Sequence, residues 1–416
     1  MHPGLRVGIS LLLVLDILSF SSCKENEPGY NQVLNPFWEY DFQVGYTSSI
    51  QPEIWENLVM YSSSIEASED LSSNDKLVAL DKEEGNLVWE WSDHFEPIYQ
   101  GFSVKSLKPI YSGAIAITIG GRNFCINLTN GVTIWKNRNA TTTSSSSLTH
   151  IGNRLFRTDV GDLATDGRYV ERIMEADFLT GNWNEVLELS GGDTLRQGVQ
   201  VPSVFTSDNG NTILVFTNST YDPQERVSHP RLLSYNLTTR SFIYDVSLGN
   251  PESGNVVDGY PVIDQSRGVV YLAVNDVMKC RNLYTGEPVW ERQLNSSLLF
   301  SGFLVVGGRI FANSEGLDPT LWSINAETGK VIWSKPSAGT SSLLQYFNET
   351  IYFVGGSDGL LHIVDALGGE TLALIKAPSQ FKDQNDYFSN NCKIDPQTGR
   401  LYVNSQRTAY CYPSYR

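Results

Sequence analysis

A frame of three residue types recurs along this chain, and it limits the fold more than any other feature. An apolar run ends at Asp or Asn, Gly follows four positions later, and Trp follows four positions after the Gly. Self-similarity of this kind marks a repeat architecture in which each copy is one supersecondary unit. The complete copies are Asp81–Gly85–Trp89, Asn127–Gly131–Trp135, Asn282–Gly286–Trp290 and Asn325–Gly329–Trp333.

Three further segments keep part of the frame. Successive copies begin 40 to 59 positions apart, an interval typical of the blades of a β-propeller. The partial copies are Asp177–Gly181–Glu185, Asn236–Arg240–Tyr244 and Asp365–Gly369–Ala373.

The frame has a structural chemistry. Asp or Asn bonds the backbone of the turn that it begins, and Gly supplies the positive φ that closes a hairpin with a bulge. Trp lies at an even offset from Gly, so we expect its ring to wedge between neighbouring blades. Most copies carry a compact residue two positions before Asp or Asn, which predicts a close approach of adjacent sheets: Ala79, Cys125, Ser234, Cys280 and Ser323, with Glu175 and Ile363 as departures.

The spacing resembles the propeller repeat of the pyrroloquinoline-quinone (PQQ) type. The segment from Ile351 to Leu372, which reads IYFVGGSDGLLHIVDALGGETL, is especially similar to it. That family includes the quinoprotein dehydrogenases and the propeller lipoprotein of the outer-membrane β-barrel assembly machine. The resemblance covers the chain from about residue 36 and implies an all-β propeller, but fold analogy is weak evidence for activity.

Two fragments at the ends of the chain bear on the number of blades. Leu401 to Tyr412 resembles two middle strands, and Phe37 to Phe42 resembles an outer strand with no unit before it. Joining them makes one more blade and removes exposed strand edges. We therefore predict an eight-bladed β-propeller closed by pairing an N-terminal strand with C-terminal strands; seven blades is the alternative. The wide gap between Asp177 and Asn236 predicts a loop insertion around Tyr221 to Pro230.

The N-terminus has the pattern of a secretory signal. Arg6 precedes an apolar run from Gly8 to Phe20, which is shorter than the roughly 20 residues of a transmembrane helix. Small residues then lead to Cys23, in an arrangement that resembles the bacterial lipobox and implies lipid attachment to that cysteine. We predict a lipoprotein signal peptide at 1–22, a polar tether at 23–35 and the propeller at 36–416. An ordinary signal peptide is the alternative.

The charge of the chain excludes one class of partner. The formal net charge is −16, so the protein gains nothing from counterion release on a nucleic acid. The same charge repels anionic headgroups, so attachment to a membrane requires an anchor.

Cysteines and histidines give no sign of reactive chemistry. Cys125, Cys280 and, by alignment, Cys411 occupy the same compact position in different units, which predicts buried thiols and not disulfides. No histidine has metal-ligand spacing, and no catalytic motif is present. We therefore predict no catalytic residue and no metal site.

The resemblance to quinoproteins raises the question of a cofactor. The catalytic members hold PQQ beneath a disulfide of adjacent cysteines, with a calcium ion bound by acidic and amide side chains. This sequence has no adjacent cysteines, and nothing in it selects a set of calcium ligands. We expect neither PQQ nor calcium.

These features favour a membrane-anchored, noncatalytic protein-binding scaffold in the bacterial cell envelope. The resemblance implies the outer membrane as location and envelope or outer-membrane proteins as partners. Barrel assembly and surface capture of protein or glycan are both open, as is the face of the membrane. The alternative is an envelope enzyme, quinoprotein or carbohydrate-active, that uses the central cavity of the propeller.

Overall fold

The computed structural model describes most of the chain from residue 34 to the C-terminus. The predicted signal peptide, Cys23 and the tether up to residue 33 lie outside the described residues. The described ranges are 34–42, 52–65, 74–93, 108–119, 122–137, 147–163, 169–190, 195–197, 199–222, 227–249, 257–294, 303–314, 318–339, 342–381, 383, 385–388 and 391–416.

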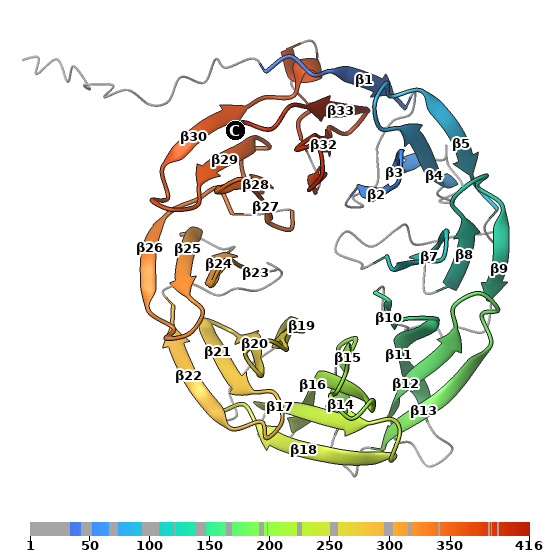
Figure 1. The fold of residues 1–416 in the computed structure, drawn as a ribbon, viewed down its shortest axis with the longest axis vertical. Coiled ribbons are helices and arrows are strands. Elements are labelled where there is room, and N and C mark those ends of the chain that lie inside the picture. The colour runs from blue at the N-terminus through green and yellow to red at the C-terminus, as the bar shows by residue number, and fades with distance from the viewer. Residues whose placement is uncertain are drawn as a thin grey trace, which may run out of the picture.

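Eight antiparallel sheets surround a common axis, as Figure 1 shows. In blades 1, 3, 5, 6 and 7, the first strand lies nearest the axis and the last lies at the rim. Blade 1 contains β2 (Glu53–Trp55), β3 (Leu58–Ile65), β4 (Asn74–Asp81) and β5 (Leu87–Trp91); blade 2 contains β6 (Ile110–Tyr111), β7 (Ala114–Ile119), β8 (Arg122–Asn127) and β9 (Thr133–Asn137); blade 3 contains β10 (Thr149–Ile151), β11 (Arg154–Leu163), β12 (Tyr169–Asp177) and β13 (Trp183–Ser190).

The second half of the ring follows the same order. Blade 4 contains β14 (Leu195–Gln197), β15 (Ser203–Thr206), β16 (Thr212–Asp222), β17 (Val227–Asn236) and β18 (Ser241–Ser247); blade 5 contains β19 (Val257–Asp264), β20 (Val269–Val274), β21 (Val277–Asn282) and β22 (Pro288–Gln293); blade 6 contains β23 (Phe303–Val306), β24 (Arg309–Asn313), β25 (Thr320–Asn325) and β26 (Val331–Pro336); blade 7 contains β27 (Gln345–Phe347), β28 (Thr350–Val354), β29 (Leu361–Asp365) and β30 (Thr371–Ile375).

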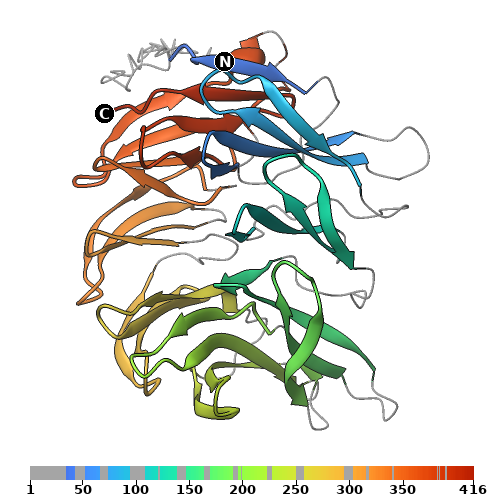
Figure 2. The same ribbon diagram turned by 45° about the vertical axis from the view of Figure 1, so that its right-hand side comes forward.

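Blade 8 closes the ring with both ends of the chain. It contains β31 (Lys393–Ile394), β32 (Leu401–Asn404) and β33 (Thr408–Tyr412), followed at the rim by β1 (Trp38–Asp41). Trp38 lies opposite Cys411 in the β1–β33 pair. Figure 2 shows β1 beside the C-terminal strands. The prediction of eight blades closed by the chain ends is confirmed, and the alternative of seven is excluded.

A β-bulge lies between the third and fourth strands of most blades. In blades 1, 2, 4, 5, 6 and 7, the register between the third and fourth strands shifts one residue before the Asx turn, as between Ala79 and Leu80. In blade 3 the shift lies further from the turn, between Ile173 and Met174. Because a bulge re-aims the residues that follow it, the outer strand of blade 3 presents different side chains to its neighbours.

The predicted loop insertion in blade 4 is a strand extension over its described part. β16 and β17 stay paired up to Asp222 and Val227, and β14 adds a strand beside the far end of β16. The loop prediction was therefore wrong there. The segment TILVFTNSTYD is rich in β-branched and aromatic residues, which favour a strand.

The core is divided among the interfaces between blades. Each of the eight interfaces holds a separate cluster of buried apolar side chains. At the interface of blades 8 and 1, Val59, Tyr61 and Leu80 pack against Tyr402 and Cys411. Among the described residues, no helix is long and apolar enough to cross a membrane.

The closing blade gives a test of the ring. Trp38→Ala removes a buried indole and leaves a cavity, so we expect the free energy of unfolding to fall by about 3–5 kcal/mol. Phe37→Ala, at an exposed neighbouring position, is the control and should cost less than about 1 kcal/mol. Urea denaturation followed by circular dichroism measures both variants. Equal midpoints for Trp38→Ala and the parent protein would contradict the role given to β1.

Candidate functional site

The Asx residues of the repeat frame hold the turn at the edge of each blade. The Asp81 carboxylate accepts hydrogen bonds from the backbone N–H groups of Glu83 and Glu84, each at 2.9 Å. The Gly85 N–H donates to the Asp81 carbonyl at 2.8 Å and completes the turn. Asn127, Asn282 and Asn325 accept bonds from their own turns in the same way.

The glycines of the frame leave no room for a side chain. Gly131 has φ +71°, and a Cβ there would lie 2.8 Å from the ring of Trp89 in the preceding blade. Gly329 has φ +66°, and its Cβ would lie 2.6 Å from Trp290. Glycine is therefore required twice, once by the backbone conformation and once by the approach of the indole.

Each frame tryptophan also bonds the next blade. Trp89 Nε1 donates to the carbonyl of Leu128, directly after Asn127, at 2.8 Å. We call this arrangement, an indole over the next blade's turn glycine with its N–H on the carbonyl after the Asx residue, the tryptophan latch. The latch donors and acceptors are Trp38 to Lys82, Trp89 to Leu128, Trp135 to Phe178, Trp290 to Ala326 and Trp333 to Ala366.

The latch is absent from interfaces whose preceding blade lacks the frame tryptophan. Between blades 3 and 4, Arg240 occupies the glycine position with φ +54°, and Glu185 occupies the tryptophan position of blade 3. Between blades 4 and 5, Tyr244 replaces tryptophan and packs on Gly286.

The C-terminal tail takes the place of the latch between blades 7 and 8. Ala373 fills the tryptophan position there. Arg416 instead forms an ion pair with Asp365 at 2.9 Å, and the Tyr415 N–H donates to the Tyr352 hydroxyl at 3.1 Å. The last residues therefore fasten blade 8 to blade 7.

The described cysteines are buried thiols. Cys125, Cys280 and Cys411 lie opposite Trp135, Trp290 and Trp38 on neighbouring strands, and all are free. Burial raises the pKa of each of these thiols to about 12, which keeps them protonated at neutral pH.

A cavity of about 430 Å³ lies where five blades meet near the axis. Its charged residues are Glu53 of β2, Lys108 before β6 and Lys393 of β31. Lys393 Nζ lies 3.2 Å from Glu53 Oε2. Burial lowers the pKa of Lys108 to about 8, and the nearby Glu53 carboxylate partly opposes this shift. The repeat frame gives no signal for this site, because the residues of the site lie outside the frame.

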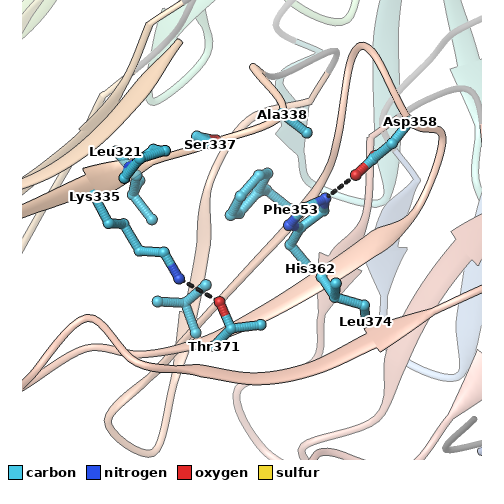
Figure 3. A pocket seen from close by; sticks show the side chains of 11 residues that line it. Leu321, Lys335, Ser337, Ala338, Phe353, Asp358, His362, Thr371 and Leu374 are labelled. Carbon is cyan, nitrogen blue, oxygen red and sulfur yellow. Dashed lines mark hydrogen bonds and ion pairs between the residues drawn. The ribbon is translucent and has the colours of Figure 1, made fainter. Parts of the chain in front are cut away.

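A second cavity, of about 280 Å³, lies between the outer parts of blades 6 and 7 (Figure 3). His362 lies 2.9 Å from the Asp358 carboxylate and stacks on Phe353 with ring centroids 4.7 Å apart. Lys335 and Thr371 form a hydrogen bond on the opposite wall. In the sequence, the i, i+4 spacing of Asp358 and His362 is the signal for this pair.

The sequence matches a family profile over nearly the whole propeller. Residues 35–219 and 231–409 match the family described as outer membrane protein assembly factor BamB. The chain belongs to this family. A comparison with curated protein sequences gave no significant match.

Solved structures similar to this BamB-family chain share its fold. BamB from Moraxella catarrhalis has 13% sequence identity and a TM-score of 0.61, with 92% of this chain and 98% of that chain covered. The quinohemoprotein alcohol dehydrogenase of Comamonas testosteroni has 10% identity and a TM-score of 0.61, with 92% and 77% covered. Sqt1 of Saccharomyces cerevisiae has 10% identity and a TM-score of 0.61, with 92% and 100% covered.

The described residues of the axial cavity include one carboxylate and two ammonium groups, which are a poor set of ligands for calcium. Near the axis, the Glu53 carboxylate is already paired with Lys393, and Lys108 adds a second ammonium group to the same cavity. Calcium prefers six to eight oxygen ligands, several of them anionic. The described part of the chain contains no group of three or more His, Cys, Asp or Glu side chains placed to hold a metal.

A glycine pair separates the two demands of the latch turn. Gly329→Ala meets both a positive φ and the Trp290 ring, whereas Gly210→Ala meets a positive φ of 80° with open space around it. We expect Gly329→Ala to destabilise the protein by roughly 1–3 kcal/mol more than Gly210→Ala, because the extra methyl overpacks the interface. Thermal and urea denaturation of both variants measure the difference. An equal loss of stability in the two variants would mean that the Trp290 ring moves aside without cost.

The lowered pKa of the buried Lys108 side chain should make the stability of the protein depend on pH. Its folded-state pKa of about 8 lies below the usual 10.5, so the unfolded chain binds more protons between these values. The cost of burying Lys108 is therefore full below about pH 8 and declines as the pH rises toward 10.5. The melting temperature of Lys108→Met, relative to the parent, should be highest at pH 7 and fall by pH 10. A difference independent of pH would contradict the assignment.

Proposed function

We propose that this protein is a noncatalytic protein-binding scaffold of the bacterial cell envelope. The support is membership of the BamB family over nearly the whole propeller, together with the latched ring. A ring whose blades are fastened to one another holds its surface in a fixed shape, and recognition by a pre-organised surface avoids the cost of ordering on binding.

The observation that carries the proposal is a recurring exposed apolar pair on the outer strands. Leu87 and Val88 on β5, Phe242 and Ile243 on β18, and Val331 and Ile332 on β26 are all exposed at the rim. Each pair lies on the last strand of its sheet, whose outer edge offers backbone donors and acceptors to a partner. Apolar side chains beside an open strand edge suit a protein partner that adds a strand.

Anchoring through Cys23 completes the proposal. A lipid on that cysteine would hold an acidic protein at a membrane that its charge does not attract, and would raise its effective concentration near membrane partners. The proposed location is the outer membrane, and the proposed partners are envelope or outer-membrane proteins of the assembly machinery or of the cell surface.

Cross-linking in cells tests the proposal. Tagged protein carrying Cys23 and the Cys23→Ala variant are cross-linked, purified and compared by mass spectrometry at equal amounts of folded protein. We expect barrel-assembly components with the parent and their loss with Cys23→Ala. Recovery of surface proteins would move the function to surface binding, whereas equal recovery with both proteins would contradict the anchoring role.

The apolar pairs give a sharper prediction. Replacing one pair at a time with serine should leave the melting temperature nearly unchanged, because these side chains are exposed. At least one replacement, among Leu87/Val88, Phe242/Ile243 and Val331/Ile332, should reduce the cross-linked partner at least fivefold. Ser334→Ala on β26 is the control and should change nothing. Full recovery with all three pairs replaced would place the partner elsewhere.

A second proposal, an envelope enzyme that uses the central cavity, rests on the buried Lys108 beside Glu53. An amine with a lowered pKa is suited to nucleophilic or general-base chemistry. Mass spectrometry of the protein purified from its own cells, for bound quinone and stoichiometric calcium, tests the quinoprotein form of this second proposal. We expect neither cofactor, and finding both would favour the enzyme over the scaffold.

A further inference from the structure

Blade 3 departs from the other blades at a position that is otherwise part of the core. Arg157 lies on the second strand, three residues after the partner of the turn Asp, and it is 2% exposed. In the other blades the same register position is apolar or aromatic, buried, and part of the cluster against the preceding blade: Tyr61, Ile117, Phe216, Leu272, Ala312, Phe353 and Val403.

The surroundings satisfy this guanidinium only in part. Arg157 Nη2 donates to Asp159 Oδ2 at 2.9 Å, and the guanidinium lies 4.2 Å from the centre of the Trp183 ring. Arg157 Nε and Nη1 and Asp159 Oδ1 are buried and have no hydrogen-bond partner in the described structure. Burial lowers the pKa of Arg157 and raises that of Asp159, and the ion pair offsets these shifts incompletely.

Trp183 is a second departure of the same blade. The corresponding residues of the blades with a complete third and fourth strand pair are smaller or lack a donor: Leu87, Thr133, Phe242, Pro288, Val331 and Thr371. The Trp183 Nε1 is buried and also has no hydrogen-bond partner among the described residues. The displaced bulge of blade 3 leaves Trp183 and Glu185 on the same side as Arg157.

These side chains surround a cavity of about 590 Å³ between blades 2 and 3. Its volume is within the usual range of about 300–1,000 Å³ for small-molecule sites. Asn182, Asn184 and Glu185 are exposed and form its mouth, while Arg157 and Asp159 form its buried end. Arg172, on the wall, is held by Glu185 with Nε 2.9 Å from Oε2.

We propose that this cavity binds a saccharide. Three buried donor nitrogens lack acceptors and one carboxylate oxygen lacks a donor, so a matching ligand must both accept and donate hydrogen bonds within one compact group. Hydroxyls on adjacent ring carbons do both. A simple anion would satisfy the donors but would leave Asp159 Oδ1 unpaired beside a like charge, so it fits less well.

The inference is independent of the proposed protein scaffold. The outer apolar pairs lie on β5, β18 and β26, whereas the cavity is formed by β9, β11, β12 and β13. Loss of saccharide binding would leave the cross-linking result unchanged, and the reverse also holds.

Titration calorimetry and tryptophan fluorescence of the mature protein test the proposal. The probes are glucose, galactose, mannose, N-acetylglucosamine and glucuronate, with their β-1,4-linked disaccharides. We expect at least one probe to bind at a single site. Tighter binding of a disaccharide would indicate a polysaccharide source, and tighter binding of a monosaccharide a free sugar. Failure of every probe to bind would overturn the proposal.

Two variants locate the site. Trp183→Phe keeps an aromatic ring but removes one donor, and should weaken binding roughly tenfold. Trp91→Phe is the matched control, because its Nε1 bonds Thr133 Oγ1 in another interface, and it should leave the affinity unchanged. Binding that both variants leave intact would place the saccharide elsewhere and overturn the assignment.

A double variant separates a binding role from a structural one. Arg157→Leu with Asp159→Ser gives blade 3 residues found at these positions in blades 5 and 8, at Leu272 and Ser405. We expect an unchanged or higher melting temperature, because both charges of the buried pair are removed together and neither is left unpaired. Saccharide binding should fall at least a hundredfold. A melting temperature lowered by several degrees would mean that the pair supports the fold, and would overturn the proposal.

Discussion

The ring depends on an indole donating one hydrogen bond across the gap between two sheets. A sheet with a polar edge and an apolar face does not by itself specify where the next sheet sits. The latch fixes this position, because the ring of Trp89 must lie over Gly131 while its N–H reaches the carbonyl of Leu128. One side chain thus couples the packing of the interface to the geometry of the next turn. Repeated around the ring, this coupling converts separate hairpins into one body.

The latches are not distributed evenly, and their absences have local replacements. Blade 4 carries Tyr244 where five other blades carry tryptophan, and it also has an extended hairpin with an added strand. Blade 8 is fastened to blade 7 through Arg416 and Tyr415. Interfaces without a latch combine clusters of apolar side chains with other hydrogen bonds, such as that from Arg154 Nη1 to Thr212 Oγ1 at 2.9 Å between blades 3 and 4. The contacts that couple neighbouring blades therefore differ from one interface to the next.

The repeat made the architecture predictable from the sequence, whereas the cavities could not be predicted from it. The spacing of Asp or Asn, Gly and Trp predicted the blades, and the fragments near Trp38 and Cys411 predicted how the ends pair, because these are local patterns. The latch acceptor was not predictable, since a backbone carbonyl leaves no trace in residue type. Arg157 and Trp183 became informative only when register aligned the blades, because the displaced bulge of blade 3 is invisible in the spacing. The extended β16–β17 hairpin was missed because a long gap between frames was read as a loop.

Closure by the chain ends has a consequence for biosynthesis. β1 is made before the seven blades that separate it from β33 in the chain, yet the two strands are neighbours in one sheet. The blades between them form from local hairpins as the chain emerges, since each contains strands adjacent in sequence. The pairing that closes the ring must wait until β33 has been made, and until then the nascent ring is an open arc with two unsatisfied edges. A chain that is stalled or truncated before β33 is therefore exposed to edge-to-edge association.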